Sequence, residues 1–250
     1  MDPFTIIPII LLVTALMAYT YKKDKYMKEP LGNLFKAFAY GLLSFPCFFF
    51  LLFLFIPFFS EGDDAGFIQT ILSIFCISAV PMEGAKLLFL WLLLRKNNYF
   101  NEHVDGIIYA TFISLGFASL ESLTFLSTEE GDAIEQTIGI TRGLLSAPVN
   151  WFYGILMGYY YSLAKFSKTN KTKYALLAFI VPVVVHAAYD LLMSSAAYME
   201  PLYEGIAFIV LLFLGYQAWK LGNKRIDQLL ERDKPYFENE EEEGESNKPK

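Results

Sequence analysis

Two charged side chains lie well inside an apolar stretch of this chain, VPMEGAKLLFLWLLLRK at residues 80–96. Glu83 and Lys86 are three residues apart, so on a helix they share one face and can form an ion pair. His186 and Asp190, four apart in another apolar stretch, share a helix face in the same way. Asp190 can accept a hydrogen bond from one imidazole nitrogen and thereby fix the tautomer of the ring. These residue types and spacings indicate acid–base chemistry in an apolar setting.

Three further polar residues lie within apolar stretches, namely Glu121, Arg142 and Asn150. Ionisable groups inside membrane-spanning segments are rare, usually face the interior of a helix bundle and mark functional sites. No basic residue lies near Glu121 in the sequence, so a structural ion pair along its own helix does not explain it. Arg142 is expected to anchor its helix near the outer boundary or to balance the charge of a carboxylate.

The composition of the chain indicates whether these residues lie in water or in a membrane. The 250 residues are 55% hydrophobic and 18% charged, and the mean hydropathy is +0.39. Because a soluble domain carries about 25% charged residues, we expect a polytopic membrane protein. Seven apolar runs are near or above the roughly 20 residues that span a bilayer, at 4–21, 37–59, 68–94, 105–127, 138–164, 174–193 and 202–221. The predicted fold class is therefore an all-α bundle of about seven transmembrane helices.

Basic residues gather in alternate connections between these runs. All but two of the 20 Lys and Arg residues lie in four segments: 22–36, 95–96, 165–173 and 220–250. The other connections, SEGDDAG, STEEGDAIEQT and SSAAYMEPLYE, contain acidic residues and no basic ones. Because basic residues mark the cytoplasmic side, the N-terminus is expected outside and the C-terminus inside. Residues 226–250, with the run FENEEEEGESNKPK, are expected to form an acidic, disordered cytoplasmic tail after a membrane domain of residues 1–225.

Four of the polar groups fall at a similar depth in their predicted helices. Counted from the cytoplasmic end at about 1.5 Å per residue, Glu83 lies about 18 Å deep and His186 about 19 Å. By the same count Asn150 lies about 21 Å deep and Glu121 about 24 Å. Taken singly, Glu83 with Lys86 could be a structural ion pair, and His186 could be a packing residue. The shared depth of groups from four helices favours one site.

The same segments resemble successive blocks of the PrsW family of bacterial and archaeal intramembrane proteases, which is distantly similar to the CAAX prenyl endopeptidases. The matching blocks are PMEGAKLLFLWLLLRKN, VDGIIYATFISLGFASLES, RGLLSAPVNWFYGILMGYYYSLA and PVVVHAAYDLLM. The resemblance implies a multi-pass peptidase of the bacterial or archaeal inner membrane. Its substrate would be a single-span or membrane-associated protein, such as an anti-sigma factor. The lipid bilayer is the other expected partner, and nucleic acid is not expected.

The resemblance implies site roles for Glu83, Glu121 and His186, in a family described as using glutamate to activate water. A carboxylate in an apolar cavity can act as a general base, so we expect Glu83 or Glu121 to activate water for amide hydrolysis. His186 would donate a hydrogen bond to the developing oxyanion, and the amide of Asn150 could donate to the same oxygen. No cofactor is expected. The competing mechanism is a zinc ion held by Glu83, Glu121 and His186.

Lys86 and Asp190 are expected to support these groups, and two positions depart from the family pattern. Met82 stands where the family usually has the first glutamate of a pair, and Asn150 stands where many members have histidine. If the missing glutamate activates water, hydrolysis is weak or absent. The chain would then be an inactive relative that acts as a membrane scaffold or binding protein, as the scaffolding subunit of gamma-secretase does. A transporter is the third hypothesis, but no discontinuous helices or internal repeat are evident.

Overall fold

All regular structure in the described part of the chain, residues 3–58, 71–127, 133–196 and 201–246, is helical. The structure is a computed structural model. Its α-helices are α1 (Pro3–Lys23), α2 (Leu31–Phe55), α4 (Val80–Leu94), α5 (Asp105–Ser127), α6 (Ala133–Phe166), α7 (Lys171–Ala196) and α8 (Pro201–Ser246). The predicted all-α fold class is confirmed for these residues. Most of the acidic connections named above fall on residues 59–70, 128–132 and 197–200, which lie outside the described part.

Five spans within the described residues are long and apolar enough to cross a membrane: Ile6–Lys23, Leu31–Phe55, Ile71–Leu94, Asp105–Leu126 and Lys171–Met193. The 34-residue α6 exceeds the length that a bilayer requires, but polar residues such as Arg142 and Asn150 lower its hydropathy. The helix α8 runs unbroken past residue 225, where the sequence predicted the tail to begin. The total of seven spans and the separate tail therefore stay predictions.

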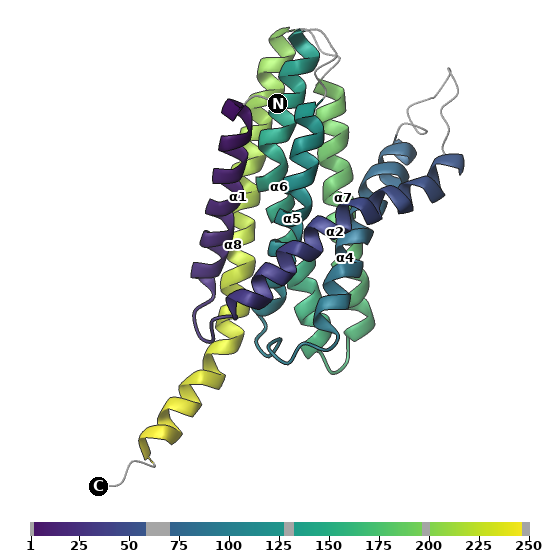
Figure 1. The fold of residues 1–250 in the computed structure, drawn as a ribbon. Coiled ribbons are helices and arrows are strands. Elements are labelled where there is room, and N and C mark those ends of the chain that lie inside the picture. Colours follow the sequence, from purple (N-terminus) through teal and green to yellow (C-terminus); the bar gives the residue numbers. More distant parts are fainter. Residues whose placement is uncertain (1–2, 59–70, 128–132, 197–200, 247–250) are drawn as a thin grey trace.

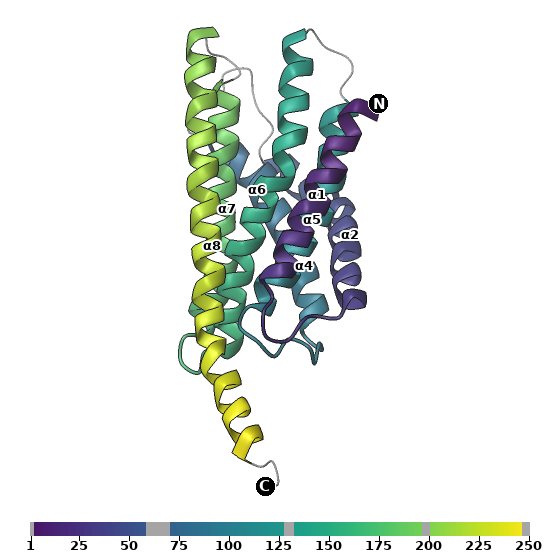
Figure 2. The ribbon, with the colours of Figure 1, turned by 90° about the vertical axis from the view of Figure 1, so that its left-hand side faces the viewer.

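The helix α5 lies at the centre of the bundle, and α1, α2, α4 and α6 all pack against it. The helices α7 and α8 pack against α6, while α2 crosses the bundle obliquely (Figures 1 and 2). The connections α1–α2, α4–α5 and α6–α7 lie together at one end of the bundle, at the bottom of Figure 1. We call this the basic end, because residues 22–30, 95–104 and 165–173 there carry the clustered lysines and arginines.

Glycines let the helix backbones touch where α5 meets its neighbours. Gly154 and Gly158 form a GxxxG pattern on α6, and a Cβ atom added at Gly158 would lie 2.6 Å from the Cα of Ile107 on α5. On the opposite side of α5, Gly116 meets Gly41 of α2 so closely that a Cβ on either residue would overlap the other helix. Small residues at such crossings permit the close van der Waals contact that drives helix association in membranes.

We expect the substitution Gly158→Ala to lower stability, because the added methyl group has no space against Ile107. Overpacking of this kind typically costs about 1–3 kcal/mol. The matched control is Gly215→Ala on α8, where no atom lies within 4 Å of the added Cβ. There alanine should leave the melting temperature unchanged or raise it, because alanine favours helix by about 1 kcal/mol over glycine. Thermal unfolding in detergent measures both, and equal shifts would contradict the close contact.

Candidate active site

Glu83 is completely buried on α4 and is held by two donors from different helices. The ammonium Nζ of Lys86, one turn further along α4, lies 2.6 Å from Glu83 Oε1. The imidazole Nδ1 of His186 on α7 lies 2.8 Å from the same oxygen. The other oxygen, Oε2, is buried without a hydrogen-bond partner. The ion pair that the sequence predicted is therefore present, and it is joined directly to the histidine.

Asn150 connects this ion pair to Glu121. Lys86 Nζ donates to Asn150 Oδ1 over 2.8 Å, and Asn150 Nδ2 donates to Glu121 Oε2 over 2.7 Å. Only this orientation of the amide is chemically consistent, because an ammonium has no acceptor and a carboxylate oxygen here needs a donor. Ser146, one turn before Asn150 on α6, donates to the same Glu121 oxygen over 2.5 Å. One hydrogen-bonded chain thus runs from α4 through α6 to α5.

The second nitrogen of His186 faces another carboxylate. His186 Nε2 lies 3.4 Å from Asp190 Oδ2, one turn further along α7. Ser78 donates to the same Asp190 oxygen over 2.5 Å. The ring of Tyr153 stacks on the imidazole, with the centroids 4.7 Å apart and the planes inclined by 19°. The imidazole is therefore fixed in position by two carboxylates and one aromatic face.

A small internal cavity of about 30 Å³ lies beside these groups. Its lining includes the predicted residues Glu121, Asn150, His186, Asp190 and Arg142. A volume of this size holds about one water molecule. The sequence predicted that Glu83 would line the same cavity, but Glu83 is not among the lining residues. Glu83 lies behind the imidazole of His186, and its Oε1 atom is hydrogen-bonded to His186 Nδ1.

Three polar side chains of this network were missed from the sequence, namely Ser78, Ser146 and Tyr153. Ser146 and Tyr153 lie four residues before and three residues after Asn150, so helical spacing alone could have found them. Ser78 lies in a π-helical segment, Ile74–Ala79, immediately before α4. A π-turn rotates the residues that precede it relative to an ordinary helix, so α-helical counting could not place Ser78.

Two of the predicted supporting residues lie at the edge of the network. The guanidinium group of Arg142 lines the cavity and lies 5.9 Å from the centre of the Phe125 ring. Met82 precedes Glu83 on α4, and its sulfur lies 3.9 Å from the Ser78 hydroxyl oxygen. Because Ser78 also bonds Asp190, Met82 is one side chain away from the polar groups. A polar side chain of the same length at this position, such as glutamate, would bring its carboxylate to Ser78.

Comparison with known families places most of the chain in one group of proteins. Residues 29–216 match the family model described as PrsW family intramembrane metalloprotease. The chain belongs to the PrsW family. This stretch contains all the predicted site residues, from Met82 to Asp190. The family is one of intramembrane proteases, so the chain is a multi-pass membrane protein with the peptidase relationship expected from its sequence.

Individual relatives match over nearly their whole length. The protein named Protease PrsW of Clostridioides difficile is 30% identical over 88% of this chain and 89% of its own length. The protein of the same name from Bacillus subtilis is 31% identical, over 80% of this chain and 86% of its own length. A third, from Halalkalibacterium halodurans, is 32% identical over 84% and 93%. No solved structure matches the chain significantly.

The family description names a metal, and the arrangement of the predicted zinc ligands can be tested against it. Both nitrogens of His186 already face carboxylates, Glu83 on one side and Asp190 on the other. The Lys86 ammonium occupies the Glu83 oxygen that faces His186. Zinc needs ligand atoms that converge on one point, commonly four in a tetrahedron, without a cation among them. In this arrangement, therefore, Glu83, Glu121 and His186 do not fit a zinc ion.

Proposed function

We propose that this chain hydrolyses a peptide bond of a single-span or membrane-associated protein, with Glu121 as the general base. The observation that carries the proposal is the buried hydrogen-bonded chain that ends on Glu121 beside a cavity of water size. Glu83 is the less suitable base, because it does not line the cavity and is engaged in the ion pair with Lys86. Glu83 instead holds the lysine and the imidazole in place.

The reaction can be written with the residues around the cavity. Glu121 takes a proton from the water, and the water oxygen forms a bond to the carbonyl carbon of the substrate. The Tyr153 hydroxyl is buried, lines the cavity and lacks a hydrogen-bond partner, so it is a donor available to the oxyanion. Glu121 then passes its proton to the nitrogen, the C–N bond breaks, and a carboxyl group and an amine result.

Asn150 and His186 take positioning roles in this scheme. The amide of Asn150 donates to Glu121 and to the backbone oxygen of Ser146, so its hydrogens are already engaged. The imidazole of His186 orients Glu83 and Asp190 on either side. The sequence predicted that His186 and Asn150 would donate to the oxyanion. We instead assign this role to Tyr153. A substrate enters only if helices separate, because the cavity holds about one water molecule.

We also propose that seven helices span the bacterial or archaeal inner membrane, with the N-terminus outside and the C-terminus inside. The support is that three connections rich in Lys and Arg lie together at the basic end. A substrate of the anti-sigma-factor type, with one spanning segment, would meet the site from within the bilayer.

The alternative function is a catalytically impaired relative that acts as a membrane scaffold. It is favoured by Met82, which presents a thioether to Ser78 where the family pattern has a carboxylate. The test compares cleavage of a single-span reporter in proteoliposomes by the chain as written and by Met82→Glu, alone and with Asn150→His. We expect Met82→Glu to raise cleavage at least about tenfold, because the new carboxylate reaches the Ser78–Asp190 pair.

Controls separate the three explanations of this experiment. Equal cleavage by the chain as written and by Met82→Glu would mean that Glu83 and Glu121 suffice. No cleavage by any folded variant would favour the scaffold. Addition of 1,10-phenanthroline, which removes zinc, should leave cleavage within about twofold if the base is a carboxylate. Complete inhibition that zinc reverses would instead assign a metal mechanism.

A further inference from the structure

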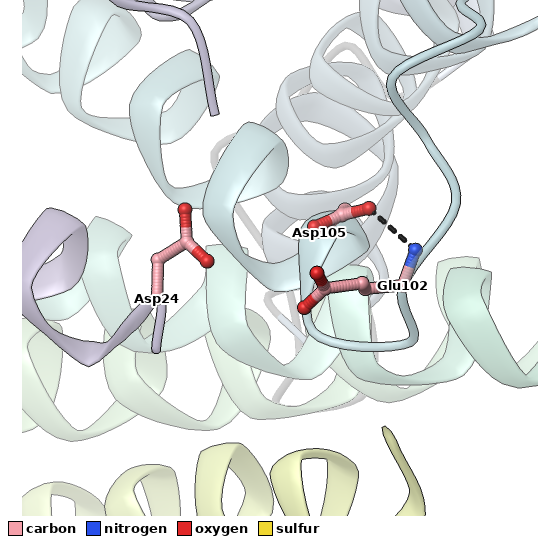
Figure 3. A group of neighbouring side chains, drawn as sticks. All are labelled: Asp24, Glu102 and Asp105. Carbon is pink, nitrogen blue, oxygen red and sulfur yellow. Dashed lines mark hydrogen bonds between the residues drawn. The ribbon is translucent and has the colours of Figure 1, made fainter. Parts of the chain in front are cut away.

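Three carboxylates meet at the basic end of the bundle, far along the chain from one another and outside the network described above. Asp24 lies in the α1–α2 connection, Glu102 in the α4–α5 connection, and Asp105 is the first residue of α5 (Figure 3). All three are buried, with 0%, 3% and 0% of their surface exposed. One oxygen from each lies within 4.8 Å of those of the other two.

Backbone amides donate to one carboxylate oxygen of each aspartate and leave the other oxygen without a hydrogen-bond partner. Asp24 Oδ2 accepts the amide hydrogen of Glu29 over 2.8 Å. Asp105 Oδ2 accepts those of Asn101 and Glu102 over 2.9 and 2.7 Å. Asp24 Oδ1, Asp105 Oδ1 and both oxygens of Glu102 are buried without a hydrogen-bond partner. Four unpartnered carboxylate oxygens therefore remain at this cluster.

The lysines near Asp24 in sequence are directed elsewhere: Lys23 forms an ion pair with Asp227 of α8 over 3.7 Å, and the charge of Lys28 lowers the pKa of Asp24 only against the larger effect of burial. Lys28 directs its ammonium group to the backbone oxygens of Tyr21 and Asp24 rather than to these carboxylate oxygens. The backbone amide of Met27 faces the Glu102 carboxylate and lowers its pKa, but the effect of burial is larger. Burial of a carboxylate without a counter-charge is strongly unfavourable, so the cluster requires a cation or bound protons.

Further acidic groups surround the cluster and increase the need for a cation or bound protons. Burial, together with the nearby carboxylates Asp24, Asp233 and Glu29, raises the pKa of Glu102 to about 8. Burial also raises the pKa of Glu29 to about 7, although the Tyr109 hydroxyl donates to this carboxylate. Asp233 of α8 is itself held by the backbone and the imidazole of His103. Carboxyl groups from three elements of the fold are thus crowded together, and their charge must be balanced by a cation or by bound protons.

We propose that Asp24, Glu102 and Asp105 bind one hard divalent cation, and that this cation joins the α1–α2 connection to the start of α5. Hard cations such as Ca²⁺ and Mg²⁺ prefer carboxylate oxygens. Two ligands of one cation can be at most twice the metal–oxygen distance apart, about 4.6–5.2 Å for Ca²⁺ and about 4.2 Å for Mg²⁺. Separations within 4.8 Å are compatible with three ligands of one calcium-sized ion.

The test uses the full-length protein in detergent after removal of cations with EGTA. Addition of 5 mM Ca²⁺ should raise the melting temperature by at least about 3 °C, since binding to the folded state stabilises it. Equilibrium binding of radioactive Ca²⁺ should give one ion per chain, and Mg²⁺ should compete more weakly. In Glu102→Gln both effects should disappear, with affinity lowered at least about tenfold.

Glu231→Gln is the matched control, because Glu231 is an exposed carboxylate on α8 near the same end. It should keep the full response to Ca²⁺. In EGTA, Glu102→Gln should be about as stable as the parent, since it replaces a buried carboxyl group whose oxygens have no hydrogen-bond partner. That result separates loss of the cation from loss of the fold. The proposal is wrong if neither Ca²⁺ nor Mg²⁺ binds the parent, or if Glu102→Gln binds Ca²⁺ as the parent does.

Discussion

Replacing Glu121 with glutamine is expected to lower cleavage of the reporter at least about 100-fold, the usual contribution of a general base. Glutamine keeps the size of the side chain and can still accept the hydrogen bonds of Ser146 and Asn150. It cannot take the proton of water. The effect should therefore fall on kcat, with KM for the reporter within about threefold of the parent value.

The experiment needs a measure of folding and a comparison with the other carboxylate. Melting curves should show that Glu121→Gln unfolds near the temperature of the parent. Glu231→Gln, far from the site, should cleave normally. If Glu121→Gln keeps more than about a tenth of the activity while Glu83→Gln loses it, Glu83 is the base and the assignment here is wrong.

The second large effect concerns stability and Lys86. This side chain is completely buried, and its ammonium lies 2.6 Å from Glu83 and 5.1 and 5.3 Å from the rings of Phe117 and Tyr153. We expect Lys86→Met to lower the free energy of unfolding by about 3–5 kcal/mol, because it leaves the Glu83 carboxylate buried without its counter-charge.

A double substitution distinguishes the loss of charge from the loss of packing. Methionine nearly matches the lysine stem, so Glu83→Gln/Lys86→Met should recover most of the stability lost in the single variant. Unfolding of all four proteins in mixed micelles gives the coupling energy. If the double variant is as unstable as Lys86→Met alone, the two side chains are not coupled and the ion pair is not what stabilises this part of α4.

The sequence predicted the helices, the local pairs Glu83–Lys86 and His186–Asp190, and the gathering of polar groups from four helices in one layer, for a simple physical reason. A charge in an apolar span must find a partner inside the bundle, so few arrangements of Glu83, Lys86, Asn150 and His186 were possible. The similar depth of the polar residues in their spans then indicated that the helices α4, α5, α6 and α7 contribute to one site. Glu121, which has no basic neighbour in sequence, was found to accept from Ser146 and Asn150 across helices.

What the sequence did not predict depends on rotation and crossing of the helices. The π-helical segment that places Ser78 has no clear signature in composition. Glu83 does not line the cavity because His186 covers its Oε1 atom, and this arrangement of side chains cannot be predicted from the sequence. The carboxylates Asp24 and Glu102 lie in connections that look solvated in sequence, and only the fold shows that they are buried.

The backbone contacts of α5 limit how the bundle can admit a peptide. Its glycine crossings with α2 and α6 leave no gap between the main chains, so a substrate cannot pass along those seams without breaking several close contacts. The contacts of α7 with α4 and with the segment before it are instead made by polar side chains, which can exchange hydrogen-bond partners. If a transmembrane segment enters between helices, we therefore expect the α4–α7 side to open, next to the π-helical segment before α4.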